Sequence, residues 1–302
     1  MCGIAGLFSK STAVEETLGK HLSAMLAQLA ERGPDSAGVA FYREPAPSGS
    51  LKVSLFSPDP EYPWREVEGE LAKSFGQVSE PEVRASHALL TVEGDAREIQ
   101  AWMGERFGDV RVMSVGERIE IFKEAGDPRD FIARFGLEEL SATHALGHTR
   151  MATESRVTTE HSHPFSTGLD LCLVHNGSLS NHNRLRRFLR GEGISFQTDN
   201  DSEVAAGYLT WRLQEGDDLS RALERCLDDL DGFYTFAVGT ADGFAVLRDP
   251  IACKPAVMAE TDEWVAMASE SRAIAVLPGA EEAEVWEPEP ARVYSWDRAK
   301  VA

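Results

Sequence analysis

The first eight residues constrain this chain most, because a cysteine directly follows the initiator methionine and heads the apolar run from Gly3 to Phe8. A small second residue favours removal of Met1, which would make Cys2 the N-terminus. Its α-amine, with a pKa of about 8, could then act as the general base for its own thiol. The apolar run predicts a buried strand that holds this end inside the fold. The alternative is an ordinary cysteine in an N-terminal strand.

Bulk properties exclude several classes of protein. The 302 residues can form one large domain or two smaller ones, and the net charge of -20 argues against a nucleic-acid or anionic-membrane surface. No apolar run approaches the roughly 20 residues of a spanning helix, and no basic signal-peptide region opens the chain. The four scattered cysteines form no Cys-x-x-Cys pair, which disfavours a metal site or a disulfide framework. We therefore expect a cytoplasmic protein, in a reducing compartment.

Periodicity in the first half predicts a helix that begins near Thr12 and ends before Gly33-Pro34, followed by a strand over 39–42. Residues 44–140 differ in character and predict a small inserted α/β subdomain. It would begin with an irregular proline-rich stretch and continue with a strand over 86–92 and a helix over 96–107. A pair of strands would follow over 110–114 and 118–122. Its expected role is to cover an edge or to contact a partner.

The second half predicts helices over 200–213 and 219–230, and a short helix over 271–276. Two hairpins are expected, over 233–247 and 256–268, and a last strand over 292–296. Antiparallel strand pairs with helices grouped between them predict α+β layers rather than a doubly wound parallel sheet.

Three polar groups could carry chemistry, and each has a structural alternative. Arg150 ends a strand and could hold a carboxylate with its planar fork, or be structural. Asn176-Gly177 could offer an amide and a backbone N–H as oxyanion donors, or form a plain hairpin turn after the strand 171–175. Asp201 could bind an ammonium group, or only favour the first turn of a helix.

Histidines are frequent between residues 144 and 182, and they raise the question of a metal. Their spacings fit no standard zinc pattern, and His161-Ser162-His163-Pro164 is typical of a loop. No glycine-rich loop of the Walker or dinucleotide type occurs either. We therefore expect neither a metal nor a nucleotide site.

The order of the motifs is more informative than any one of them. Cys-Gly-Ile at the N-terminus is followed by Arg-Gly-Pro-Asp-Ser-Ala-Gly, Gly-His-Thr-Arg-Met-Ala-Thr, His-Pro, His-Asn-Gly, Asp-Ser-Glu and Arg-Asp-Pro. Over residues 1–43 and 145–276 this series resembles the class II glutamine amidotransferases. These are N-terminal nucleophile hydrolases, so the resemblance implies a four-layer αββα fold, with the small α/β subdomain inserted in this chain.

The resemblance also implies the chemistry. Cys2 would attack the side-chain amide of glutamine, release ammonia and leave a γ-glutamyl thioester that water hydrolyses. The α-amine of Cys2 would act first as base and then as acid. Asn176 and the Gly177 N–H would form the oxyanion hole.

The same resemblance assigns the substrate contacts. Arg150 would hold the α-carboxylate of glutamine, and Asp201 would hold its α-amine. Thr153 and His163 would line or support the pocket, and Arg32 would order the N-terminal region. Met151 departs from the pattern, since relatives often carry an aromatic residue after the arginine.

The chain ends near residue 302 without a synthase domain, so we expect the ammonia acceptor site on another polypeptide. A free-standing glutaminase of this length resembles the small subunit of a glutamate-synthase-like complex, such as N-methylglutamate synthase. The resemblance then implies no cofactor on this chain. FMN, and iron–sulfur or other cofactors, would belong to partner subunits. The alternatives are a glutaminase of an asparagine-forming or amidophosphoribosyl type, and a non-catalytic scaffold.

Overall fold

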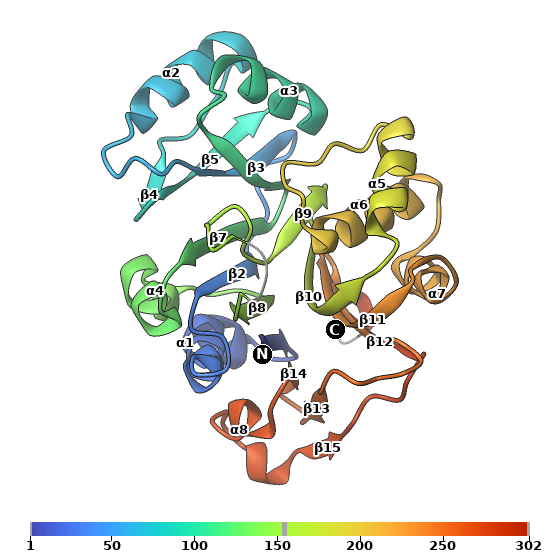
Figure 1. The fold of residues 1–302 in the computed structure, drawn as a ribbon. Coiled ribbons are helices and arrows are strands. Elements are labelled where there is room, and N and C mark those ends of the chain that lie inside the picture. Colours follow the sequence, from blue (N-terminus) through green and yellow to red (C-terminus); the bar gives the residue numbers. More distant parts are fainter. Residues whose placement is uncertain (1, 153–155, 301–302) are drawn as a thin grey trace.

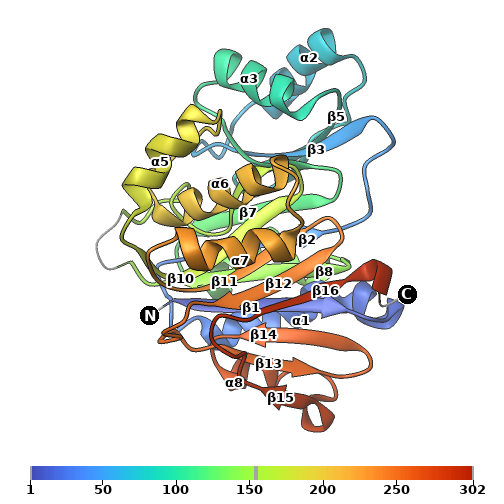
Figure 2. The ribbon, with the colours of Figure 1, turned by 90° about the vertical axis from the view of Figure 1, so that its right-hand side faces the viewer.

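Two antiparallel sheets lie face to face with helices on both outer sides (Figures 1 and 2). The computed structural model describes residues 2–152 and 156–300. In sheet order, the seven-stranded sheet contains β15 (Glu284–Trp286), β13 (Val257–Glu260), β14 (Trp264–Ala268), β1 (Gly3–Ser9), β8 (His144–Arg150), β2 (Ser36–Tyr42) and β7 (Ile119–Ala125). The five-stranded sheet contains β16 (Val293–Asp297), β12 (Gly243–Arg248), β11 (Gly232–Thr240), β10 (Leu171–Leu179) and β9 (Phe165–Gly168).

Helices complete the four layers. The seven-stranded sheet is covered by α1 (Thr12–Leu29), α4 (Pro128–Phe135) and α8 (Ser271–Ile274). The five-stranded sheet is covered by α5 (His182–Gly191), α6 (Asp201–Gln214) and α7 (Leu219–Asp229). The predicted αββα sandwich is therefore confirmed. Within the described residues, no helix is both long and apolar enough to cross a membrane.

Strand β1 is apolar on both faces because it lies between two cores. Ala5 and Leu7 pack under α1, whereas Ile4 and Phe8 point into the space between the sheets. This alternation has the period of two that a strand imposes, and it explains why the run from Gly3 onwards is continuously apolar. Because β8 and β14 flank β1 on both sides, the N-terminal end of the chain is fixed in the middle of a sheet.

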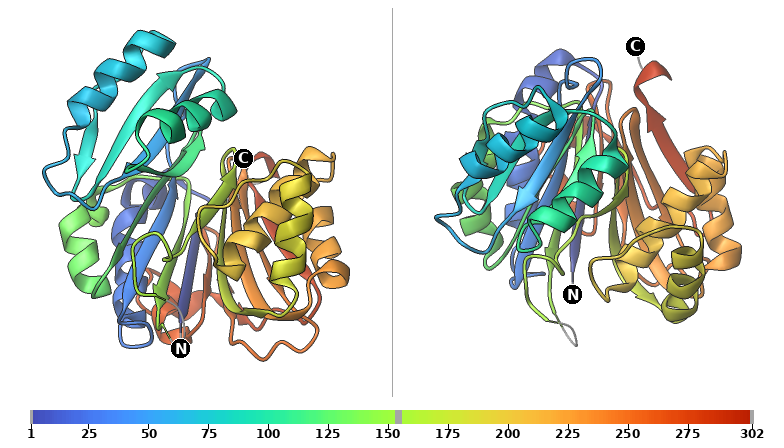
Figure 3. Two further views of the ribbon diagram at one scale, coloured as in Figure 1. Left: turned by 45° about the horizontal axis from the view of Figure 1, so that its top comes forward. Right: turned by 90° about the horizontal axis from the view of Figure 1, so that it is seen from above.

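The insertion has its own sheet and core (Figure 3). Its strands are β4 (Glu82–Arg84), β5 (His87–Glu93), β3 (Ser50–Phe56) and β6 (Arg111–Gly116). Helices α2 (Trp64–Phe75) and α3 (Ala96–Arg106) cover this sheet. The chain enters and leaves through a hairpin of the body, since β2 and β7 are paired as far as Tyr42 opposite Ile119.

The predicted limits of the insertion, 44–140, are wider than this unit. Strand β7 and helix α4 belong to the body, so the expected pairing of 110–114 with 118–122 is wrong. Strand β6 pairs with β3, and β7 pairs with β2. The chain changes sheets at Glu117 and Arg118, whose backbone N–H groups donate to the carboxylate of Asp170 at 2.8 and 2.9 Å.

Candidate functional site

Cys2 is half-buried at the entrance of β1, where it meets the end of β8. Its Sγ lies 3.4 Å from the backbone N of Met151 and 3.7 Å from the Met151 carbonyl oxygen. Its own carbonyl oxygen accepts hydrogen bonds from Arg32 Nε at 2.6 Å and from Asn176 Nδ2 at 3.1 Å. The backbone of Cys2 is therefore held by Arg32 and by Asn176, and its thiol contacts the backbone of Met151.

Arg32 also connects the N-terminal segment to the residues that follow the C-terminal end of β14. Its Nη1 pairs with Glu270 Oε1 at 2.7 Å, and Glu270 follows Ser269 directly after that strand. Ser269 Oγ accepts from the Ile4 backbone N at 2.9 Å and from Asn176 Nδ2 at 3.1 Å. Sequence reasoning missed Ser269, since its only signal is a hydroxyl directly after an apolar strand.

The pair Asn176-Gly177 lies inside β10 and not in a turn. The strand runs on to Leu179 because β11 pairs with it throughout, with Asn176 opposite Thr235 and Gly177 opposite Tyr234. The prediction of a turn at this pair is therefore wrong, since strand pairing outweighs the local turn preference. Asn176 is brought to Cys2 as predicted, and its side chain is buried.

Gly177 is required by its backbone. Its φ is 148°, and an added Cβ would lie 1.9 Å from the carbonyl oxygen of Phe233. A side chain at this position would also lie 2.7 Å from His175 Nε2, so it would displace either β11 or the His175 ring. Only glycine leaves the backbone in its observed conformation at this point.

Asp201 lies in the first turn of α6, directly beyond the end of β10. Asn200 caps this helix by accepting from the Ser202 backbone N at 2.8 Å. Asp201 Oδ2 accepts from the backbone N of Leu179 at 2.9 Å. Asp201 is therefore an acid in the first turn of a helix, as the structural alternative has it, and its role in binding an ammonium group stays a prediction.

Arg150 is buried at the last position of β8, and its Nη1 donates to the carbonyl oxygen of Arg156 at 3.0 Å. The loop after α1 holds the same strand end, since the Ala152 N–H donates to Asp35 Oδ2 at 2.7 Å. This contact gives the Arg-Gly-Pro-Asp motif a role that the sequence alone did not show. Thr153, the predicted neighbour of Arg150 in the pocket, lies outside the described residues.

His163 lies between the sheets, behind the strand that carries Arg150. Its ring centroid is 4.1 Å from that of His148 and 5.0 Å from that of Phe165. Burial, with the nearby histidines and cations, lowers the pKa of His163 well below its usual value. Its contacts are with the residues behind the site, so it has the supporting rather than the lining position. Within the described residues no group of three His, Cys, Asp or Glu side chains could hold a metal ion.

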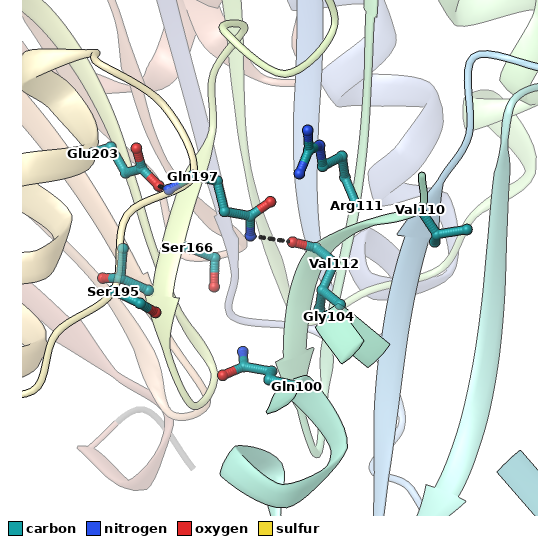
Figure 4. Close-up of a pocket in the computed structure, with 10 residues that line it drawn as sticks. Gln100, Gly104, Val110, Arg111, Val112, Ser166, Ser195, Gln197 and Glu203 are labelled. Carbon is teal, nitrogen blue, oxygen red and sulfur yellow. Dashed lines mark hydrogen bonds between the residues drawn. The ribbon is translucent and has the colours of Figure 1, made fainter. Parts of the chain in front are cut away.

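A separate hollow lies between the insertion and the body (Figure 4). It is crossed by a hydrogen bond from Gln197 Nε2 to the Val112 carbonyl oxygen at 2.9 Å. Glu203 at its edge already accepts from the backbone N of Gln197 and of Thr198. None of the candidate site residues lines this hollow, so it is a joint between the two parts and not the candidate site.

Comparisons with known proteins identify the family. Residues 148–276 match the family model described as "Glutamine amidotransferase domain". Over the full length of both chains, the protein is 54% identical to the glutamine amidotransferase-like protein GlxB of Rhizobium meliloti. This chain belongs to the class II glutamine amidotransferases. The amidotransferase is also 32% identical, over 97% of its length, to a putative glutamine amidotransferase of Methanothermobacter thermautotrophicus.

The solved structures support the fold of this amidotransferase. The glutamine phosphoribosylpyrophosphate amidotransferase of B. subtilis superposes with a TM-score of 0.63 at 20% identity. That alignment covers 99% of the present chain and 48% of the other one. The likeness therefore concerns the N-terminal nucleophile sandwich, and it leaves open what receives the ammonia.

Proposed function

We propose that this amidotransferase hydrolyses glutamine through a Cys2 thioester and passes the ammonia to a synthase active site on a partner subunit. One observation carries the proposal. The Cys2 carbonyl oxygen lies 3.1 Å from Asn176 Nδ2, although the two residues are 174 positions apart. The fold thus brings together the residue that carries the thiol and a buried amide donor.

The reaction follows from the groups present. After removal of Met1, the α-amine of Cys2 takes the thiol proton, and Sγ attacks the side-chain carbonyl carbon of glutamine. The carbonyl electrons move to oxygen, where Asn176 Nδ2 and the Gly177 N–H donate to the oxyanion. The protonated α-amine returns its proton to the leaving nitrogen, so ammonia departs and the γ-glutamyl thioester remains. Water then attacks the thioester with the same groups and releases glutamate.

Recognition of the amino-acid end of glutamine is assigned to two charged residues. The guanidinium of Arg150 is suited to the α-carboxylate, because it can offer two parallel N–H donors. The carboxylate of Asp201 is suited to the α-ammonium group. We assign His163 and Arg32 to the support of this pocket, from behind and from the N-terminal side. Thr153, which lies outside the described residues, keeps its predicted assignment to the same pocket.

The partner is supported by chemistry and by the surface of α5. Released ammonia would be protonated in water and would lose its nucleophilicity, so it must reach its acceptor directly. Helix α5 contains no acidic residue and exposes three arginines, Arg184, Arg187 and Arg190, on a chain of net charge -20. None of the three forms an ion pair within the described residues, and Phe188 beside them is 44% exposed. Such a face fits an acidic protein surface.

The partner that we propose is a flavin-containing synthase of the glutamate-synthase or N-methylglutamate-synthase type, in the cytoplasm. FMN and any iron–sulfur cluster would reside on that subunit. Native purification with its bound partners tests this assignment. A complex with flavin absorbance supports it, whereas a colourless complex that requires ATP would indicate an asparagine-forming or other amidotransferase.

The first experiment is mass spectrometry of the N-terminal peptide, before and after treatment with an electrophilic glutamine analogue. We expect a chain that begins at Cys2 and gains one adduct there, with excess glutamine protecting it. Cys2→Ala should abolish ammonia release and still assemble with the partner. A retained Met1 without an adduct, or an active Cys2→Ala variant, would disprove the mechanism and leave a non-catalytic scaffold.

A further inference from the structure

His148 is a buried polar side chain that the mechanism above does not use. It lies on β8, opposite Ile4 of β1 and Gly38 of β2, and is 1% exposed. Within the described residues, neither of its ring nitrogens has a hydrogen-bond partner, and Oδ1 of Asn176 has none either. Native structures rarely leave buried donors and acceptors unpaired, so this set of atoms requires an explanation.

The unpaired atoms belong to groups that face each other between the two sheets. Burial lowers the pKa of His148 to about 3. The Asn176 side chain and the His175 backbone lie close enough to the ring to raise this pKa in part. The ring is therefore neutral, with one N–H donor and one acceptor nitrogen. The donor is what the unpaired Oδ1 lacks, and the Asn176 side chain lies close enough to act on the ring.

The His148 ring packs against the ring of His163. The two ring centroids are 4.1 Å apart with an interplanar angle of 33°. The His163 carbonyl oxygen lies so close to Gly38 that an added Cβ there would be 2.0 Å from it. The packed His163 ring therefore limits how far the His148 ring can shift.

We propose that His148 is a positioning residue, whose ring N–H donates to Asn176 Oδ1 and holds Nδ2 towards the carbonyl oxygen of bound glutamine. This inference rests on the proposed role of Asn176 in the oxyanion hole. An amide that flips would present Oδ1 to the developing negative charge and repel it. Ser269 Oγ contacts the amide at Nδ2, and His148 acts on Oδ1, so the two together fix its orientation. Catalytic hydrogen bonds commonly tighten only when substrate is bound.

A matched pair of variants tests the donor. His148→Met and His148→Gln have similar length and volume, but only glutamine keeps an N–H donor. We expect His148→Met to lower kcat for glutamine hydrolysis about ten- to a hundred-fold, less than the roughly hundred- to thousand-fold cost of removing an oxyanion donor itself, with KM changed by less than about threefold. His148→Gln should recover most of the loss. Alkylation of Cys2 by iodoacetamide forms no oxyanion, so its rate should stay within about twofold of the wild-type rate in both variants.

The control is His144→Met on the same strand. His144 is equally buried and has a pKa lowered to about 3 by burial, but it stacks on Tyr42 at 4.2 Å and contacts Thr240 instead of Asn176. It should keep the wild-type kcat. If His148→Met does not fold, His148→Phe takes its place.

Three results would overturn the inference. The first is a kcat of His148→Met within threefold of the wild-type value. The second is an equal loss of kcat in His144→Met, or an equal loss in the rate of Cys2 alkylation in His148→Met. The third is a kcat of His148→Gln as low as that of His148→Met. Failure of the proposed function is distinguishable, because then the wild-type chain would not hydrolyse glutamine or Cys2→Ala would remain active. That outcome overturns both proposals.

Discussion

At the scale of single residues, Gly177 shows how strictly the backbone fixes the site. Its position within β10 and its positive φ allow no Cβ. We predict that Gly177→Ala lowers the free energy of unfolding by about 2–4 kcal/mol, as steric conflict at a special backbone position does. It should also abolish glutamine hydrolysis, because the clash with Phe233 would displace Asn176 and Gly177, the proposed oxyanion donors. Urea unfolding and an ammonia-release assay would measure both effects.

The matched control for this change is Gly69→Ala in α2, where an added Cβ meets nothing within 4 Å. Replacing a helical glycine by alanine should stabilise the protein by about 0.5–1 kcal/mol and leave the activity unchanged. A Gly177→Ala variant as stable and active as this control would show that β10 accepts a side chain at residue 177, and that the backbone does not require glycine there.

Single residues were also the part of the site most open to prediction. Cys2, Arg150, Asn176 and Asp201 occur in an ordered series of motifs, and each has a side chain whose chemistry indicates a role. Ser269 could not be predicted in the same way. It bonds to Ile4 and to Asn176 only because β14 lies beside β1, and no local pattern reports that pairing.

At the scale of elements, the insertion occupies the connection of a β-hairpin. Residues Tyr42 and Ile119 are paired across β2 and β7, and the pairing continues outward through the Arg43 N–H to the Arg118 carbonyl oxygen at 3.2 Å. The inserted sheet has a core of its own and adds Phe56 and Met113 to the edge of the core between the main sheets, whose other residues come from the body, so we expect the body to fold without it.

We therefore predict that replacing residues 45–116 by an Asn-Gly turn leaves a folded glutaminase. Asn-Gly suits a two-residue hairpin connection. The kcat for glutamine hydrolysis and the rate of Cys2 alkylation should stay within about threefold of those of the full chain. If the shortened chain is insoluble or unfolded while the full chain is folded, the insertion is part of the structural core and not an accessory.

Prediction of the elements failed where local signals conflicted with pairing. The prolines between Pro45 and Pro63 predicted an irregular stretch and hid strand β3 and the start of α2. The strands at 110–114 and 118–122 were predicted to pair because they are adjacent in sequence. They separate because Asp170, more than 50 residues further on, binds the connecting backbone.

At the scale of the whole molecule, buried histidines should make the protein sensitive to acid. Burial lowers the pKa values of His87, His144 and His148 to about 3, against about 6.5 when unfolded. Between pH 6.5 and 3 the unfolded chain binds more protons, so stability is complete above pH 6.5 and is lost as the pH falls. Each of these histidines should lower the free energy of unfolding by about 2 kcal/mol when the pH falls from 7.5 to 5.

His87→Phe tests this prediction away from the candidate site. The His87 ring lies among Phe56, Phe122 and Phe135, with centroids 5.2 to 6.0 Å away, so phenylalanine fits its surroundings. The stability lost between pH 7.5 and 5 should be smaller than in the wild type by about one histidine's share, as measured by urea unfolding. An identical loss in both proteins would mean that His87 is already protonated in the fold.

The continuous strand β10 has a consequence for how activity can be controlled. Asn176 and Gly177 are in register with β11, so they cannot move unless two paired strands slide past each other. The backbone that carries the two proposed oxyanion donors is thus fixed before any substrate or partner arrives. On the opposite side, Met151 touches the thiol through its backbone and is 45% exposed. A partner protein can therefore contact Met151 and shift the backbone that touches the Cys2 thiol. If kcat changes when the partner binds, we expect the change to come from movement of the thiol and not of Asn176 and Gly177.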